Sequence, residues 1–162
     1  MEKIVNVAQY IYVKYKETTG EEIDEMKLQK LLYFSQRECI AVTNEPMFPE
    51  SFEGWKYGPV CRELRGSITP DGIIDYDSDI SDENKYIVNN VIAEYGALAS
   101  WKLSELSHRE KSWLNARVGL KEWENGRNKI SLADIRADAE KVRPYDHVWD
   151  MYYDEFEDAE ES

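Results

Sequence analysis

The chain has 162 residues, the common size of a single domain, and we therefore expect one hydrophobic core. Lysine and arginine number 20 against 33 aspartate and glutamate residues, and the net charge of −13 argues against direct binding to a nucleic-acid backbone. Only two cysteines and no apolar run of about 20 residues argue against a structural zinc site and a membrane span, so we expect a cytoplasmic protein.

The first part of the sequence predicts two helices. Apolar residues recur at steps of three and four over residues 4–16, which is typical of an amphipathic helix, and Gly20 can end it. Asp24 can cap a second helix that continues to about Val42 and stops at Asn44-Glu45-Pro46. The apolar surface of the second helix is wide, so we expect it to be the central helix, buried on more than one side.

The next segment predicts a small β-hairpin-like element. Residues 51–57 alternate large apolar residues with small or charged ones, as in a short strand or an extended loop. Gly58-Pro59 turns the chain, and Pro59 is expected to open a short helix. A turn at 69–72 and a partner strand at 73–76 are expected to follow.

The second half of the sequence predicts further short helices. Serines precede them at capping spacing, and the expected segments are Ser81–Gly96, 101–106, a Ser107-x-x-Glu110 capping box followed by 113–120, and a Ser131-x-x-Asp134 cap followed by a helix to Val142. The fold is therefore predicted to be mainly α, a single globular helical domain over residues 1–145 with a small β-hairpin-like element. Residues 146–162 are expected to form an acidic C-terminal tail that is partly disordered.

The residues that could support chemistry form no recognisable catalytic or metal motif. His108 could pair with Glu110 for acid–base work, or it could bond the backbone at a helix entry. The carboxylates at 75, 77 and 79 resemble half of a calcium loop, but Ile80 and Tyr86 stand where glycine and glutamate should follow. We assign no catalytic residue, metal or cofactor.

Charged and aromatic residues suggest possible contact surfaces. Lys27, Lys30 and Arg37 lie along one side of the second helix, where they could hold a carboxylate or a partner's acidic face, or could be solvated with their apolar stems packed on rings. Trp55, Tyr57 and Trp113 are large amphipathic side chains that could serve as interface anchors or as core residues.

Two blocks of sequence resemble the phage-associated Panacea antitoxin family. One block joins a basic helix to a turn, and its matching residues are Lys27, Leu28, Lys30, Leu31, Tyr33 and Phe34, followed by Trp55, Tyr57, Gly58, Pro59 and Val60. The other consists of Leu106, Ser107, His108 and Trp113. Ser112 departs from the proline usual before the tryptophan, and Gly54 departs from a common alanine.

The resemblance implies one mainly helical domain that acts by protein contact. It implies an antitoxin of a type II toxin–antitoxin system, encoded beside a toxin gene, often in a phage or prophage, that neutralises a cognate toxin protein by direct binding. Alternatives are a proteolytic adaptor that delivers a partner to an AAA+ protease such as ClpXP, and another phage or prophage interaction protein. The family-motif or partner-binding residues are Lys27, Lys30, Tyr33, Trp55, Tyr57, Gly58, Pro59, Ser107, His108 and Trp113.

The acidic tail allows three roles. It carries eight carboxylates and no lysine or arginine over residues 146–162, with Tyr152, Tyr153 and Phe156 among them. It could keep the protein soluble, imitate nucleic acid in the basic cleft of a toxin, or fold on a partner. An apolar stripe at Val148, Met151, Tyr152 and Phe156 also permits self-association, so the oligomeric state stays open.

Overall fold

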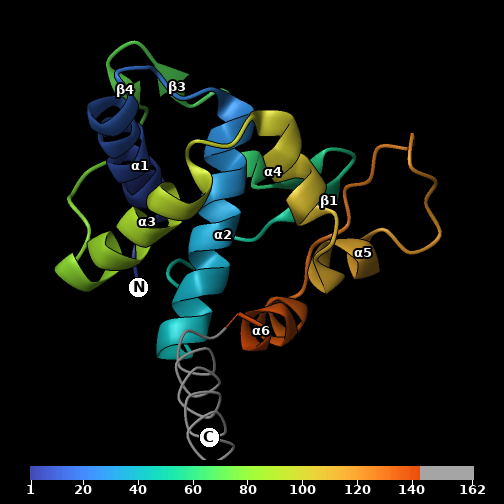
Figure 1. The fold of residues 1–162 in the computed structure, drawn as a ribbon. Helices are drawn as coiled ribbons and strands as arrows, with labels where there is room; N and C mark the ends of the chain where they lie inside the picture. Colours follow the sequence, from blue (N-terminus) through green and yellow to red (C-terminus); the bar gives the residue numbers. More distant parts are fainter. Residues whose placement is uncertain (143–162) are drawn as a thin grey trace, which may run out of the picture.

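The computed structural model describes residues 1–142, and its first two helices begin and end as their sequences predict. α1 (Ile4–Thr19) ends where Gly20 adopts a left-handed φ of 76°. α2 (Glu25–Thr43) begins at Asp24, whose side chain accepts a hydrogen bond from a backbone N–H of the first turn. These two helices run beside each other in Figure 1 and supply much of the core.

A short antiparallel hairpin follows α2, formed by β1 (Glu53–Trp55) and β2 (Gly58–Val60). Pro59 lies within β2 opposite Gly54, so the expectation that Pro59 opens a helix is wrong. A proline is tolerated there because the hairpin has only two strands, and its missing N–H interrupts no third strand. The helical turn comes later, as the 3₁₀ helix η1 (Arg62–Leu64).

A second, smaller hairpin pairs β3 (Ile68–Thr69) with β4 (Gly72–Ile73) across the predicted turn. The Thr69 side chain accepts from the Asp71 N–H at 3.3 Å and donates to the Gly72 carbonyl at 2.7 Å, which stabilises the turn. The strand expected over 73–76 stops at Ile73, so the prediction was too long.

Four further helices complete the described chain: α3 (Asp82–Tyr95), α4 (Ser100–Ser107), α5 (Lys111–Ala116) and α6 (Leu132–Glu140). The predicted caps Ser81 and Ser131 are confirmed, because each hydroxyl accepts a hydrogen bond from the backbone N–H three residues later.

The predicted capping box at Ser107 is wrong. Ser107 is the last residue of α4, and its hydroxyl donates to the Ser104 carbonyl at 2.7 Å. Glu110 precedes α5, but its carboxylate bonds Arg37 instead of capping a helix. A buried cation nearby is therefore the stronger competitor for this carboxylate.

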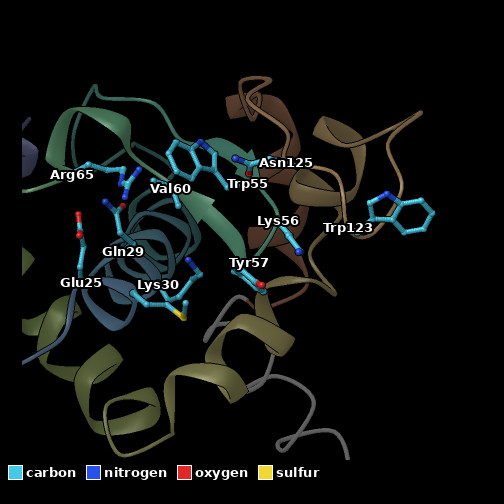
Figure 2. Close-up of a pocket in the computed structure, with 11 residues that line it drawn as sticks. Glu25, Gln29, Lys30, Trp55, Lys56, Tyr57, Val60, Arg65, Trp123 and Asn125 are labelled. Carbon is cyan, nitrogen blue, oxygen red and sulfur yellow. The ribbon is translucent and has the colours of Figure 1, made fainter.

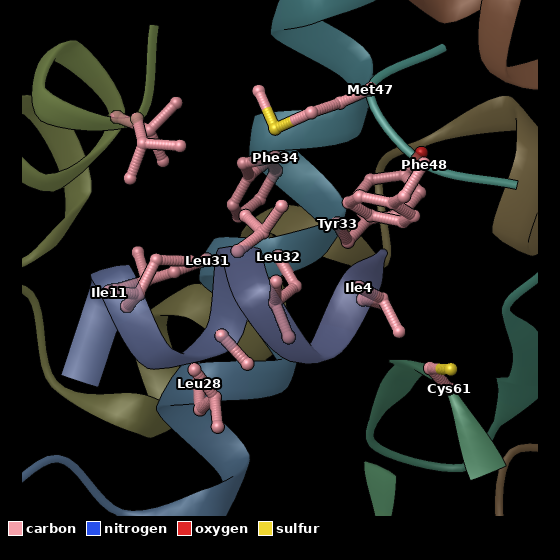
Figure 3. Packing of buried hydrophobic residues seen from close by; sticks show 14 of the residues in the cluster. Ile4, Ile11, Leu28, Leu31, Leu32, Tyr33, Phe34, Met47, Phe48 and Cys61 are labelled. Carbon is pink, nitrogen blue, oxygen red and sulfur yellow. The ribbon is translucent and has the colours of Figure 1, made fainter. Parts of the chain in front are cut away.

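α2 occupies the centre of the fold, as its wide apolar surface predicts. It contacts α1 and α3 on one side and α4 and α6 on the other (Figure 1). Leu28, Leu31 and Leu32 are at most 1% exposed within the core shown in Figure 3. Burying each side chain contributes about 1.5–3 kcal/mol to stability. The mainly α fold with a small β-hairpin is thus confirmed.

The remaining sequence expectations concern the cysteines, the membrane and the tail. Cys39 and Cys61 are buried free thiols. Among residues 1–142, no helix is long and apolar enough to cross a bilayer. The acidic tail, with its apolar stripe at Val148, Met151, Tyr152 and Phe156, lies outside the described residues.

Candidate functional site

Three cationic side chains of α2 are buried instead of forming the predicted surface patch. Lys27, Lys30 and Arg37 are 8%, 1% and 6% exposed. The Lys27 ammonium donates to the Tyr15 hydroxyl at 3.2 Å and to the Gly96 carbonyl at 3.0 Å. These cations are therefore not solvated on the surface, because neighbours surround α2 and its cations find acceptors inside the protein. Their expected role in holding a carboxylate or a partner's acidic face stays a prediction.

Arg37 and Glu110 form a buried ion pair that links α2 to the start of α5. The Arg37 Nη1 donates to Glu110 Oε1, its Nη2 donates to the Tyr95 hydroxyl at 2.9 Å, and the guanidinium lies 4.8 Å from the Phe34 ring centroid. Burial raises the pKa of Glu110, and the adjacent guanidinium opposes that rise. This carboxylate is therefore committed to Arg37, and the acid–base pair with His108 is not formed.

His108 joins the corner between α4 and α5 to the hairpin. Its ring stacks on Trp113 with centroids 4.0 Å apart and an interplanar angle of 10°. The Lys56 backbone, in the hairpin turn, tends to raise the pKa of the ring, and the expected bond to the backbone of a helix entry stays a prediction. Burial lowers the pKa of His108, which favours the neutral ring, and Nε2 has no hydrogen-bond partner within residues 1–142. The stack on Trp113 therefore gives the ring a packing role.

Other motif residues fix the hairpin on the helices. Lys30 donates to the Pro59 carbonyl at 3.1 Å, and the Trp113 indole donates to the Trp55 carbonyl at 2.8 Å. Gly58 has a φ of 119°, and a Cβ at this position would lie 2.4 Å from Lys30 Cε and 2.5 Å from Ser107 Oγ. Only glycine allows this close approach, which explains the glycine of the motif.

Tyr33 and Ser112 connect α2 to α5 through their hydroxyls, which lie 2.6 Å apart. Burial raises the pKa of Tyr33, so the phenol stays protonated. The Ser112 N–H also donates to Asp138 Oδ2 at 2.8 Å. The serine that departs from the family's proline thus makes two hydrogen bonds that proline could not make.

The second departure concerns Gly54 in β1. A Cβ at this position would lie 3.0 Å from the Ala116 Cβ and 3.2 Å from Arg117 Cγ. The missing side chain therefore lets the hairpin pack closely on the end of α5.

Two pockets lie on either side of the turn formed by Lys56 and Tyr57. The first, which we call the Lys30 pocket, has a volume of about 530 Å³ and is shown in Figure 2. It is lined by α2, the hairpin, the end of η1 and the loop before α6. The lining residues are Glu25, Met26, Gln29, Lys30, Trp55, Lys56, Tyr57, Val60, Arg65, Trp123 and Asn125. The second, the His108 pocket, has about 660 Å³ and shares Lys56, Tyr57 and Trp123 with the first.

Exposed aromatic rings and cations alternate across this face. Tyr57 and Trp123 are 56% and 67% exposed. Lys56 Nζ lies 5.2 Å from the Tyr57 ring centroid, and the Arg65 guanidinium lies 4.9 Å from that of Trp55. Aromatic and arginine side chains of this kind carry most of the binding energy at protein interfaces. The arrangement can therefore bind a partner, and we call it the hairpin face.

Sequence reasoning missed the residues that follow α5. Arg117 is 6% exposed and donates to the carbonyls of Gly54, Lys121 and Glu124 at 3.0, 3.1 and 2.6 Å. These bonds hold the loop after α5 beside the hairpin and bring Trp123 to the Lys30 pocket. No spacing in the sequence signals the contact with the hairpin, because the carbonyl of Gly54 lies 63 positions before Arg117.

The half calcium loop is used for local structure. Asp77 accepts from Lys3 and from the Asn6 amide, and Asp79 accepts from Lys85 at 2.5 Å. The bonds that Asp77 accepts lower its pKa to about 2. Within the described part of the chain, no three His, Cys, Asp or Glu side chains gather as a possible metal site.

Comparison with known families gives one match. The family described as "Antitoxin SocA-like, Panacea domain" matches residues 28–114, which include all the motif residues except Lys27. No curated protein and no solved structure matches the chain. Because the match covers more than half of the chain, this protein belongs to the Panacea-domain family of SocA-like antitoxins.

Proposed function

We propose that this protein is the antitoxin of a type II toxin–antitoxin system and neutralises a cognate toxin by direct protein contact in the cytoplasm. The family match over residues 28–114 is the observation that carries the proposal. The family is one of binding proteins, which favours a role without catalysis. The net charge of −13 favours a protein partner over a nucleic acid.

The hairpin face supports the proposal as the surface that would meet the toxin. It combines two pockets with exposed aromatic rings, and Arg117 and Lys30 hold its backbone from inside. A surface held in place before binding loses little conformational freedom on association, which favours tight contact. We therefore propose Trp55 and Tyr57 as partner-contacting residues. The residues that position the face from within are Tyr33, Gly58, Pro59, Ser107, His108 and Trp113. Lys27 instead bonds Tyr15 and Gly96, which are not part of this face.

The test is growth after induction of the gene adjacent to this one, alone and together with this protein, with the neighbour's level followed by immunoblot. Rescue of growth at an unchanged neighbour level is the expected result, because masking leaves the toxin intact. Rescue with loss of the neighbour would instead support delivery to an AAA+ protease such as ClpXP. A neighbour that is toxic and is not rescued would overturn the proposal.

A further inference from the structure

The Lys30 pocket is lined by a cation that forms no ion pair within residues 1–142, although the negative charge of Asp24 acts on it from outside the pocket lining. Lys30 is 1% exposed, and its ammonium has three N–H donors, of which one bonds the Pro59 carbonyl at 3.1 Å. No carboxylate forms an ion pair with Lys30 among the residues that the structure describes. A buried cation in this state is costly, in contrast to Arg37, which has Glu110 beside it.

The cation lines an open pocket. Figure 2 shows Lys30 entering from α2, opposite the hairpin residues Trp55 and Tyr57. Burial lowers the pKa of Lys30 to about 8, so the ammonium form is weakly favoured near neutral pH and would be stabilised by a carboxylate. The pocket thus has a desolvated ammonium in its lining, which a bound anion would stabilise.

Cations outnumber carboxylates around the pocket. Lys56 and Arg65 line its rim together with Lys30, against Glu25 alone, and the Glu25 carboxylate already accepts from the Gly66 N–H at 3.0 Å. This local excess of cations stands out in a chain of net charge −13. Charge complementarity therefore favours an anionic occupant.

The walls of the pocket also select for an apolar group. Met26, Val60 and the rings of Trp55, Tyr57 and Trp123 line it. A nucleic-acid backbone would bring many phosphates against an acidic protein, whereas a protein segment can bring one carboxylate and an adjacent apolar side chain.

From these contacts we infer that the Lys30 pocket binds an aspartate or glutamate side chain of a partner protein, flanked by an aromatic or aliphatic residue, with Lys30 as the carboxylate's donor. The inference deepens the proposed function and rests on it, in that the partner is the toxin. It makes Lys30 a recognition residue for partner specificity.

A toxin-independent experiment tests the chemistry of the pocket. A phage-displayed library of random heptapeptides is selected on the immobilised full-length protein, and an enriched peptide is labelled with fluorescein for affinity measurement. Enrichment of Asp or Glu beside Phe, Trp, Leu or Ile is expected. Lys30→Met and Met26→Glu should each weaken the labelled peptide about tenfold or more, because one removes the donor and the other repels the carboxylate.

The matched control is Val42→Glu, which adds the same charge to α2 outside the pocket. Val42 is 51% exposed and Met26 is 37% exposed, so both variants should fold. Circular dichroism and thermal unfolding of each variant establish this. Val42→Glu should keep the peptide affinity within about twofold of the unaltered protein.

Other outcomes overturn the inference. Enrichment of peptides without carboxylates would show that the pocket does not bind a carboxylate. The same conclusion would follow if Lys30→Met and Met26→Glu bound the peptide as tightly as the unaltered protein does. Binding of a fluorescein-labelled single-stranded oligonucleotide that Lys30→Met abolishes would make the occupant a nucleic acid. Tighter peptide binding after the eight carboxylates of residues 146–162 are changed to amides would make the occupant this chain's own tail.

The growth assay then separates this inference from the proposed function. Rescue that is lost in Lys30→Met and Met26→Glu but kept in Val42→Glu supports both. Rescue that Lys30→Met and Met26→Glu retain would overturn the carboxylate pocket while the antitoxin role stands. If the unaltered protein gives no rescue, the antitoxin role fails, and the peptide selection alone decides what the pocket binds.

Discussion

The buried pair of Arg37 and Glu110 allows the fold to be tested through a double-mutant cycle. Glu110→Leu would leave the guanidinium inside the protein, where the Tyr95 hydroxyl still accepts a hydrogen bond from it. Both side chains of the pair are nearly inaccessible, at 7% and 11% exposure, so water cannot replace the carboxylate. Removing one partner of such a pair destabilises a protein by about 3–5 kcal/mol.

The expected change in melting temperature follows from the length of the chain. At about 2–4 °C per kcal/mol for a domain of this size, Glu110→Leu should lower the melting temperature by about 6–20 °C. Arg37→Met should be destabilising for the same reason, because it leaves Glu110 buried without its cation. The double variant should recover most of the loss, because no buried charge is then left unpaired.

Urea and thermal unfolding at pH 7, followed by circular dichroism, measure all three variants. Arg109→Met is the control, since it removes an exposed pair with Glu105 and should change stability by about 0.5 kcal/mol or less. A loss below about 1 kcal/mol for Glu110→Leu, or a double variant that loses the sum of the single losses, would refute this account of the pair.

Three further predictions concern buried groups. Burial lowers the pKa of Lys30 from 10.5 to about 8, so between these pH values the unfolded chain binds one more proton than the folded protein. The free energy of unfolding of the unaltered protein, relative to that of Lys30→Met, should therefore rise by about 3 kcal/mol between pH 8 and pH 10.5. A difference in urea unfolding that does not change with pH would contradict the burial of this amine. Gly58→Ala should lower the free energy of unfolding by about 2–5 kcal/mol, because of the positive φ and the contact that a Cβ would make with Lys30. Gly20→Ala has open space around it and should lower that free energy by only about 1–2 kcal/mol. Equal losses of stability in thermal unfolding would argue against the close approach at Gly58. Ser112→Ala should lower the free energy of unfolding by about 1–3 kcal/mol, because it leaves the Tyr33 hydroxyl without its partner. The double variant Ser112→Ala/Tyr33→Phe should regain part of that stability, and no recovery would show that loss of this hydrogen bond does not cause the destabilisation.

Local sequence signals predicted the helices well because their causes are local. Asp24, Ser81 and Ser131 cap helices through bonds to residues three positions away, and Gly20 ends α1 through its own φ. The wide apolar surface of α2 likewise revealed its central position. These features depend on periodicity and capping, which a sequence displays directly.

The remaining features depend on contacts between distant residues. Ser107 and Glu110 have capping-box spacing, but Arg37, 73 positions before Glu110, takes the carboxylate. Lys27 and Lys30 look solvated from their helix alone, whereas Gly96 and Pro59 supply acceptors from other elements. The motif residues could therefore be found from the sequence, but their role in holding the hairpin could not.

The most direct test of the central claim is the affinity between this protein and the purified product of the adjacent gene, measured by isothermal titration calorimetry. Trp123→Ala removes a ring of the hairpin face, and Trp101→Ala removes an equally exposed ring on α4, outside both pockets; the two side chains are 67% and 69% exposed. Neutralisation through the hairpin face predicts a complex that Trp123→Ala weakens about tenfold or more and Trp101→Ala leaves nearly unchanged. No complex, or equal effects of the two substitutions, would contradict neutralisation through the hairpin face.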